Sequence, residues 1–374
     1  MTVTSEDVAR LAGVSRATVS RIFNSSATVS PQLRKRVEQA AHTLGYEPDM
    51  AARSLVSQRS RTIVFGLFSR GEWTFARLAD PGWYFYLDVL REIEAETRAA
   101  GYDLLLPSQP RQDGGLGYVR SLTARRVAGA IVAGCRPADP RIPSLIESGI
   151  PTTFVDVPAA GPHASYVASN NEDGAFRITE HVIGLGHRDI AVLTGDGGDV
   201  PAITRLAGMR RAFAAYRVPE RHEMVTFTDW TTEAGAEATR RWLDDGLRFT
   251  AIIAHSDMLA IGAVRALHER GVRVPDEVSV TGFDDIDLSR YVDPPLTTIR
   301  QDPSAMGSWA ARTLVEMIAT DGPAPEPMII PTELVVRQST GPVPRRSRSA
   351  AAKQPARAGT AGGRSTGARS ARKR

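Results

Sequence analysis

The sequence lacks several features that would place it in large classes of proteins. Its 374 residues include a single cysteine, Cys135, which excludes a disulfide framework and a zinc site built from cysteines. No apolar run approaches the roughly 18 residues of a membrane span, and the N-terminal residues MTVTSEDVARLAG do not resemble a secretory signal. We therefore expect a soluble, cytoplasmic protein without a membrane partner, and the length favours two or three domains.

Catalytic and metal-binding patterns are absent as well. His163, His181, His187 and His222 have neither the spacing of paired metal ligands nor a thiol partner, so we expect no metal and no cofactor. The glycine-rich residues 195–199 (GDGGD) lack the Lys-Ser/Thr pair of a phosphate-binding loop. Aspartates at strand ends also occur in hydrolases, but no Ser-His-Asp set is in register. The sequence therefore does not predict an enzyme.

Charge is distributed unevenly along the chain, although the net charge is only +4. Residues 1–60 carry +3 and residues 345–374 carry +10 with no acidic residue, whereas residues 61–344 carry −9. An acidic body thus lies between two basic ends, and each basic end is a candidate for contact with nucleic acid.

The N-terminal basic region begins with signals for two short helices. Thr4 is a suitable N-cap for a helix through Leu11, and Gly13 ends that helix. Ser15 then caps a second helix over residues 16–23. The connection between them is too short for anything but a steep crossing, which predicts a helix-turn-helix. The apolar residues expected to share one face of the two helices are Val8, Leu11, Val14, Val19 and Ile22.

A third helix is predicted to begin at Ser30 and Pro31, because a capping residue is followed there by proline at the first helical position. Gly45 ends this helix. Its apolar residues, which repeat at helical spacing, are Leu33, Val37, Ala40, Ala41 and Leu44.

The second helix carries an exposed basic face that suits a DNA major groove. Arg16 and Arg21 can pair with guanine O6 and N7, beside Ala17 on the same face. The short polar side chains expected to contact phosphates are those of Ser15, Thr18, Ser20 and Asn24. The alternative from these residues alone is a small helical bundle with a solvated basic face.

The same stretch resembles the DNA-binding headpiece of the LacI/GalR (lactose-repressor-like) family of bacterial transcription regulators. The matching motifs, all in register between residues 3 and 55, are D-V-A, A-G-V-S, T-V-S-R, V-S, R-x-x-V, L-G-Y-x-P and A-R-x-L. The resemblance implies that Arg16, Ala17 and Arg21 read bases. The capping residues Thr4 and Ser30 are also expected to contact DNA.

The resemblance also implies a hinge helix at about residues 49–56, which completes a headpiece of residues 1–60. Leu55 matches the leucine that enters the minor groove at the centre of the operator; the alternative is an ordinary linker residue. A seven-residue helix is marginal alone, so this segment should fold only when it is paired with its dimer mate on bent DNA.

From Arg61 onward, short apolar runs alternate with amphipathic helical patterns. Such β-α alternation predicts parallel sheets covered by helices on both faces, and the length of the region favours two lobes. The expected strands cover residues 62–68, 102–106, 127–133, 151–155, 190–194, 224–227, 251–254 and 278–282, and the expected helices cover 84–100, 172–186, 205–216, 231–246 and 258–270.

This body resembles the effector-binding core of the same family in the segments DGAFRITEHVIGLGHRDIAVLTG, AIIAHSDMLAIGAVRALHERGVRVPDEVSVTGFDD and PPLTTIRQDPSAMG. The resemblance implies an α/β fold similar to periplasmic sugar-binding proteins over residues 61–340, with two lobes, three crossings and a ligand between the lobes. The first lobe is expected at residues 61–160 and 292–322, and the second at 161–291 and 323–340. Residues 69–83 read as an insertion.

Candidate effector contacts lie beyond the carboxyl ends of the predicted strands, where ligands bind in open parallel sheets. Carboxylates, an arginine and an indole in such positions suit a saccharide. The residues that the resemblance and the strand ends select are Phe85, Tyr86, Asp156, Arg205, Trp230, Ser256, Asp257 and Asp284.

Alternatives stay open for several of these candidates. Asp284 and its neighbour Asp285 could cap the following turn, Asp257 could be purely structural, and Trp230 could belong to the core. The family's sugar binders usually have asparagine where this chain has Ser256, which puts one hydroxyl contact in question.

Residues 341–374 contain no large apolar residue after Val343, which predicts a basic, disordered tail. The tail could contact DNA phosphates in a salt-dependent way, or it could simply aid solubility. Because no leucine heptad is present, a homodimer is favoured over a tetramer.

Taken with the resemblance, the sequence predicts a ligand-responsive, sequence-specific repressor of a carbohydrate-utilisation operon. It would bind a palindromic operator in double-stranded DNA as a dimer, in the bacterial cytoplasm and at the nucleoid when bound. The alternatives are a regulator of the same family that responds to a non-sugar ligand such as a nucleoside, a solute-binding protein and an enzyme.

Overall fold

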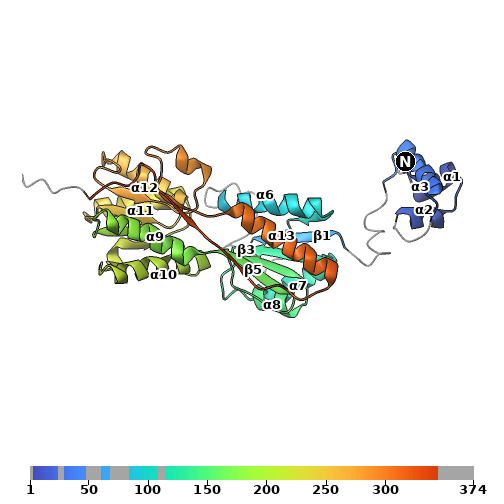
Figure 1. Cartoon of the computed structure of the whole chain (residues 1–374), viewed down its shortest axis with the longest axis horizontal. Helices are drawn as coiled ribbons and strands as arrows, with labels where there is room; N and C mark the ends of the chain where they lie inside the picture. Colours follow the sequence, from blue (N-terminus) through green and yellow to red (C-terminus); the bar gives the residue numbers. More distant parts are fainter. Residues whose placement is uncertain (1–2, 24–28, 48–59, 68–83, 108–113, 344–374) are drawn as a thin grey trace, which may run out of the picture. The chain divides into compact units, whose positions relative to one another are not determined.

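The computed structural model describes residues 3–23, 29–47, 60–67, 84–107 and 114–343 (Figure 1). Several predictions fall outside these ranges and stay predictions. They concern Asn24, Leu55, the hinge helix at residues 49–56, the insertion at residues 69–83 and the tail after residue 343.

The described part of the N-terminal region contains three helices, α1 (Ser5–Ala12), α2 (Arg16–Phe23) and α3 (Pro31–Leu44). The predicted caps are present: the Thr4 hydroxyl accepts from the Asp7 amide, and the Asp7 carboxylate accepts from the Thr4 amide at 3.0 Å. The Ser15 hydroxyl accepts from the Thr18 amide at 3.2 Å. The capping side chains therefore fix where α1 and α2 begin.

Both ends of α3 are also defined by local residues. Ser30 accepts from the Leu33 amide at 3.3 Å, and Gly45 ends α3 in the left-handed conformation with a φ of 65°. At such an angle a side chain is disfavoured, which explains why glycine ends the helix.

The three helices share one apolar core in which Val8, Val19, Ile22 and Val37 are at most 2% exposed. Leu11, which we expected in this core, is 54% exposed, and that prediction is wrong. The reason is that α1 buries the stripe formed by Val8 and its neighbours Ala9 and Ala12, and position 11 lies to one side of that stripe.

Residues 60–343 form two parallel sheets. The first has six strands in the order β11-β5-β4-β3-β1-β2, and the second has four in the order β7-β6-β8-β9. The first contains β1 (Thr62–Leu67), β2 (Asp103–Leu105), β3 (Gly129–Ala133), β4 (Thr152–Val155), β5 (Ala164–Ser169) and β11 (Met328–Ile330). The second contains β6 (Ile190–Thr194), β7 (Val225–Phe227), β8 (Ala251–Ala254) and β9 (Ser279–Thr281).

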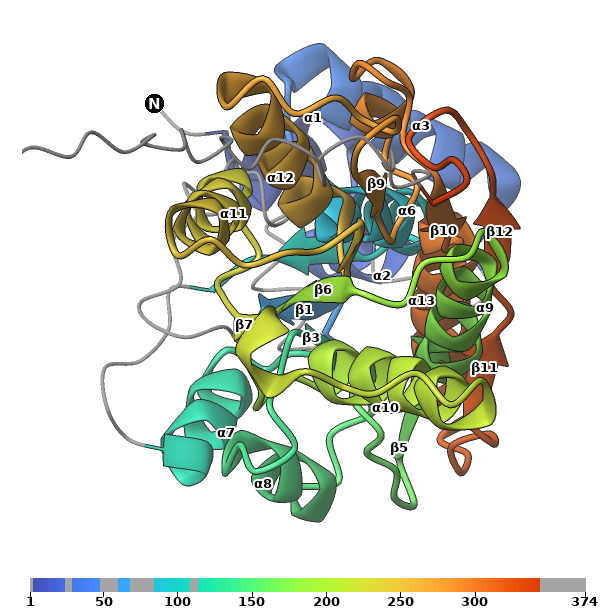
Figure 2. The same ribbon diagram turned by 90° about the vertical axis from the view of Figure 1, so that its left-hand side faces the viewer.

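Helices cover both faces of each sheet, as Figures 1 and 2 show. On the first sheet, α6 (Tyr84–Ala99) packs beside α13 (Pro303–Thr320), and α7 (Gly114–Ala124) beside α8 (Arg141–Glu147). On the second sheet, α9 (Asn171–Gly184) packs beside α10 (Val200–Ala215), and α11 (Thr232–Asp244) beside α12 (Asp257–Glu269). Short 3₁₀ helices lie at His222–Met224 and Asp287–Arg290. We call each sheet with its helices a lobe.

The apolar strands explain this layering. In β1, Ile63, Phe65 and Leu67 point to the cluster under α6 and α13, and Val64 points to the opposite cluster with Tyr118. A strand that is apolar at every position can be stable only when both faces of its sheet are covered. None of the described helices is long and apolar enough to cross a membrane.

Three segments connect the two lobes. The first runs from β5 to α9, the second from β10 (Thr298–Arg300) to α13, and the third from β11 to β12 (Glu333–Val335). β10 and β12 pair antiparallel, and the Asn170 amide donates to the Ile330 carbonyl at 2.8 Å. These hydrogen bonds hold the three crossing segments side by side.

The strand pairing corrects two of the predicted lobe boundaries. β5 pairs with β4 and β11 pairs with β5, so residues 164–169 and 328–330 belong to the first sheet and not to the second lobe. Parallel strands are usually joined through a helix, but residues 156–163 join β4 to β5 without one, so β-α alternation does not predict β5. The remaining boundaries stay a prediction.

Candidate functional site

The proposed DNA-reading face of α2 is open to solvent. Arg16, Ala17, Ser20 and Arg21 are exposed, whereas Val19 on the other face is buried. Of the remaining described candidates, Thr4, Ser15 and Ser30 cap helices and Thr18 lies within α2. The hydroxyls of Ser15 and Thr18 are 2.9 Å apart, and Thr4 and Ser30 are exposed. The arrangement leaves the arginines available to a partner, and their base-reading role stays a prediction.

Arg205 of α10 is the centre of a polar cluster in the body. Its side chain is 5% exposed; Nε donates to Asn171 Oδ1 at 2.7 Å, and Nη1 donates to the His255 carbonyl at 2.5 Å and to Asp284 Oδ1 at 3.3 Å. The guanidinium lies 3.8 Å from the centre of the Phe283 ring. A buried cation is tolerated only with such partners, so these contacts fix the position of Arg205.

The first lobe contributes Asp156 and Tyr86 to the same cluster. Asp156 follows β4, is 2% exposed and has a φ of 60°, and Tyr86 Oη donates to Asp156 Oδ2 at 3.2 Å. Burial raises the pKa of Asp156, and the Arg205 charge acts in the opposite direction. Burial and the Asp156 charge raise the pKa of Tyr86. Because the Arg205 charge acts on both groups, side chains from the two lobes share one electrostatic environment.

Asp284 follows β9 in the second lobe and completes the charged part of the cluster. Burial raises its pKa to about 6, although the Arg205 charge and a 2.7 Å hydrogen bond from Gln301 Nε2 act in the opposite direction. The Asp156 charge also raises the pKa of Asp284. Two carboxyl groups therefore share one arginine.

Asp285, in contrast, belongs to a structural ion network. Its oxygens are 2.7 Å from Arg300 Nε and 2.5 Å from Arg337 Nη2. Burial raises the pKa of Asp285, but the hydrogen bonds from Arg337 and Arg300 lower it by more, so the net shift is downward. The geometry thus separates the two neighbouring aspartates: Asp284 joins the cluster, and Asp285 ties the crossing segment to the end of the sheet.

Two further candidates, Ser256 and Asp257, are engaged at the start of α12. The Ser256 hydroxyl caps this helix by accepting from the Leu259 amide at 3.2 Å. Asp257 accepts from Thr298 Oγ1 at 2.5 Å and from the Ile286 amide at 2.9 Å, so each of its oxygens has a partner within the protein. The geometry favours the structural alternative for Asp257.

The aromatic candidates lie in different places. Phe85 is 9% exposed and belongs to the apolar cluster under α6, so the structure does not bring it to Arg205. The Trp230 ring lies 5.7 Å from the Arg205 guanidinium and also packs against the core of the second lobe. Its Nε1 donates to Asp199 Oδ2 at 3.0 Å. Trp230 thus stands at the boundary between core and cluster.

Three residues of the cluster were missed by the sequence reasoning: Asn171, His255 and Gln301. Asn171 and Gln301 lie on crossing segments for which no strand was predicted, whereas His255 follows a predicted strand and was passed over for Ser256 and Asp257. His255 Nδ1 is hydrogen-bonded to Thr194 Oγ1 at 2.9 Å, and burial lowers the pKa of His255 to about 3, so the ring is neutral.

Some of the buried polar atoms without a hydrogen-bond partner lie in this cluster, and others, such as Ser165 Oγ and Thr281 Oγ1, lie elsewhere in the described residues. Within the described part of the chain, Asp156 Oδ1, Gln301 Oε1 and His255 Nε2 are buried and have no hydrogen-bond partner. Leaving such an atom without a partner is costly, and water or a ligand ordinarily supplies the missing bond. We call the group of Tyr86, Asp156, Asn171, Arg205, His255, Asp284 and Gln301 the Arg205 cluster.

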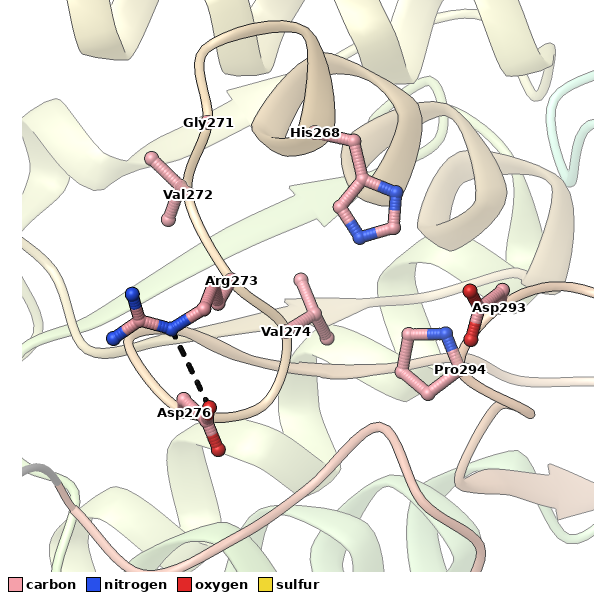
Figure 3. Close-up of a pocket in the computed structure, with 8 residues that line it drawn as sticks. All are labelled: His268, Gly271, Val272, Arg273, Val274, Asp276, Asp293 and Pro294. Carbon is pink, nitrogen blue, oxygen red and sulfur yellow. Dashed lines mark ion pairs between the residues drawn. The ribbon is translucent and has the colours of Figure 1, made fainter.

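A separate surface hollow of about 350 Å³ lies beyond the end of α12. Figure 3 shows His268, Val274 and Pro294 around it, with Arg273 paired to Asp276 at 3.4 Å on its rim. None of its lining residues belongs to the Arg205 cluster. The hollow therefore contributes nothing to the candidate site.

Comparison with known proteins agrees with this architecture. Bacterial regulatory proteins of the lacI family match residues 4–49, and the periplasmic binding protein-like domain matches residues 179–340. The transcriptional regulator CelR of Thermobifida fusca is 33% identical over 341 residues, which cover 90% of this chain and 98% of that protein. This chain belongs to the LacI family. The repressor PurR of Photobacterium profundum is 32% identical over 342 residues, again 90% of this chain and 98% of that protein.

Solved structures of LacI-family proteins share the fold. The lac repressor dimer bound to operator and the anti-inducer ONPF has a TM-score of 0.78 at 30% identity, covering 91% of this chain and 100% of that one. The complex of the transcriptional regulator CelR with cellobiose has a TM-score of 0.66 at 31% identity, covering 90% and 99%. The predicted family and fold are thus confirmed: the chain is a ligand-responsive transcriptional regulator, and these relatives are regulators rather than enzymes.

Proposed function

We propose that this LacI-family protein is a repressor that binds a palindromic operator as a homodimer. Binding of a saccharide at the Arg205 cluster changes its affinity for the operator. It would act on a carbohydrate-utilisation operon in the bacterial cytoplasm. The observation that carries the ligand assignment is the set of buried, unpartnered acceptors around Arg205.

The chemistry of the cluster favours a neutral ligand rich in hydroxyl groups. Asp156 Oδ1 and Gln301 Oε1 are buried acceptors without donors, and hydroxyls are donors of the right kind. Since Asp156 and Asp284 share the single charge of Arg205, an anionic ligand such as a sugar phosphate would meet an acidic site. A hydroxylated ring also offers C–H groups to the indole of Trp230, which lies 5.7 Å from Arg205. The cellobiose bound to the related regulator CelR supports this assignment.

A nucleoside is the second candidate ligand. Its ribose hydroxyls would meet the same acceptors, and its base would stack on Trp230 more fully than a sugar does. The two candidates differ in the base alone, so a comparison of free saccharides with nucleosides separates them.

The DNA-binding assignment rests on α2. Arg16 and Arg21 are exposed together with Ala17 on the face opposite the buried Val19 and Ile22, so both arginines can enter a major groove without a change of fold. The related lac repressor dimer bound to its operator supports a dimeric mode of binding. Leu55, outside the described residues, is proposed to enter the minor groove between two such half-sites.

A thermal-shift screen of saccharides, sugar phosphates and nucleosides tests the ligand class. A ligand at 100 times its Kd adds about 2.7 kcal/mol to the free energy of unfolding, which gives a clear rise in Tm. We expect cellobiose or another neutral saccharide to give this rise and sugar phosphates to give less.

The matched variants for this screen are Asp284→Asn and Asp276→Asn. Asp284 lies in the Arg205 cluster, whereas Asp276 lies on the rim of the separate hollow. The first variant should lose the ligand-dependent rise in Tm and the second should keep it. If nucleosides stabilise the protein and no saccharide does, the sugar assignment is wrong.

A further inference from the structure

Arg136 links the two lobes beside the Arg205 cluster. It lies three residues after β3 in the first lobe, and its guanidinium is 2.8 Å from Asp196 Oδ2 and 3.7 Å from Asp199 Oδ1. Both aspartates follow β6 in the second lobe. The side chains are 36%, 19% and 27% exposed, so these ion pairs are partly shielded from solvent.

The glycine-rich residues 195–199 are shaped around these contacts. A Cβ on Gly195 would lie 2.0 Å from the Trp230 ring, and one on Gly198 would lie 3.2 Å from Arg136 Cζ. The Gly198 amide donates to Asp196 Oδ1 at 2.8 Å, which orients that carboxylate. Residues 195–199 lack the signature of a phosphate-binding loop. Their glycines instead leave room for Arg136 and the Trp230 ring close to the backbone.

Asp199 joins the ion pair to the candidate site. Its Oδ1 faces Arg136 and its Oδ2 accepts from Trp230 Nε1 at 3.0 Å. The Trp230 ring in turn lies 5.7 Å from the Arg205 guanidinium, and the charge of Asp199 acts on Tyr86 of the first lobe. One carboxylate thus connects the interlobe ion pair to the ring that would face a ligand.

We propose that Arg136 is a positioning residue of the effector site, which holds the lobes together through Asp196 and Asp199 and fixes Trp230 through Asp199. This inference rests on the proposed function of the Arg205 cluster. Arg136 needs no contact with the ligand in this role. It sets how much of the protein has its two lobes closed and its indole in place before a ligand arrives.

The electrostatics give the direction of the effect. Without Arg136, Asp196 and Asp199 of the second lobe lose this cation of the first lobe, and its share of the attraction across the lobes is lost. The pairs are partly exposed, so their contribution is modest and weakens with salt. The ratio of closed to open protein should therefore fall about twofold to fivefold in the Arg136→Ala variant, and an effector that binds the closed form should bind more weakly by up to the same factor.

Spin-label distances test the closure directly in the full chain. Leu116→Cys on α7 and Ile203→Cys on α10 place labels on opposite lobes, at side chains that are 63% and 45% exposed. Cys135 is buried and burial raises its pKa, so it should stay unlabelled. Dilution of labelled chains with unlabelled protein limits the signal to distances within one chain, even in a dimer.

We expect a short-distance and a longer-distance population in the otherwise unaltered protein, and a larger share of the longer one in Arg136→Ala. Arg136→Lys should restore part of the short population because the charge is retained. Arg141→Ala is the matched control, since Arg141 pairs with Asp139 within the first lobe and should leave the distance unchanged. Addition of 1 M salt should lengthen the distance only while Arg136 is present.

The effector arm uses cellobiose as the probe. Arg136→Ala should bind it up to about fivefold more weakly, and the double variant Arg136→Ala/Asp196→Ala should be no weaker than the single one. An unchanged distance distribution in Arg136→Ala, or equal effects of Arg136→Ala and Arg141→Ala, would overturn the proposal. If no saccharide binds the unaltered protein, the ligand assignment fails, and the distance measurement still decides the role of Arg136.

Discussion

Arginine has opposite environments in the two folded regions of this chain. In the N-terminal helices, Arg16 and Arg21 of α2 are exposed. In the body, Arg205 of α10 is 4% exposed and donates to Asn171, to the His255 carbonyl and to Asp284. The first pair is available to an external partner, and Arg205 is committed to the protein and to whatever enters its cluster. The two roles differ in the burial of the arginine side chain, and a charge count along the sequence does not contain that information.

The largest expected effect follows from removing the buried arginine. Arg205→Met keeps an apolar chain on the Phe283 ring but removes the donor to Asn171 and to the His255 carbonyl. It also removes the cation beside Asp284, which keeps its hydrogen bond from Gln301. Breaking a buried pair from one side costs about 3–5 kcal/mol of the free energy of unfolding. Chemical denaturation of the full chain measures this loss. Arg16→Met, the exposed counterpart, should change the same quantity by less than about 0.5 kcal/mol, and equal losses in the two variants would contradict the comparison.

The exposed arginines should show the reverse pattern, with an effect on DNA and none on folding. Arg21→Ala is expected to weaken binding to a duplex selected from a random pool by the unaltered protein, at a cost of about 1–3 kcal/mol. Binding to random DNA should change far less. Mobility-shift titrations at fixed salt measure both affinities. If specific and random duplexes are bound as before, Arg21 does not read bases.

The difference between the two regions also explains what could be predicted from the sequence. The helices of the N-terminal region are defined by residues close in the chain, such as Thr4 with Asp7 and Gly45 after α3, so their starts and ends were predicted well. Leu11 was the exception, because which of several apolar positions faces the core depends on how α1 packs, and spacing alone does not give that.

In the body, the strongly apolar strands were predictable, and four of the predicted effector contacts meet: Tyr86 and Arg205, which lie on helices, and Asp156 and Asp284, which follow strands. Gln301 and Asn171 were not predictable because they lie on crossing segments, whose neighbours are distant in sequence. Phe85 shows the converse case, since adjacent residues on a helix point in different directions and only Tyr86 reaches the cluster.

The buried cluster should also make stability depend on pH. The pKa of Asp284 is raised to about 6 from an unfolded value near 3.8, so the folded state favours its protonated form. This contribution to stability is fully present below pH 3.8 and is lost as the pH rises through 6. Between these values the free energy of unfolding should fall by about 1–2 kcal/mol on account of Asp284.

Thermal or urea unfolding across that pH range checks the contribution of Asp284. Asp284→Asn removes the titrating group and should flatten the dependence, whereas Asp287→Asn, at an exposed position nearby, should leave it as it is. If the free energy of unfolding of Asp284→Asn depends on pH as in the unaltered protein, the effect belongs to other buried carboxyls, such as Asp257. No comparable slope is expected from the exposed face of α2.

The smallest expected effect is at Leu11, where the N-terminal region departs from its predicted core. Because Leu11 is 54% exposed, Leu11→Ala should change the local stability of the three helices by less than about 0.5 kcal/mol. Ile22→Ala, at a position that is 2% exposed, should cost about 2–5 kcal/mol. Hydrogen exchange of α1 and α3 amides in the full chain measures both changes without isolating the region. Equal losses in the two variants would show that Leu11 is buried by a surface that the single chain does not present, such as a second chain or bound DNA.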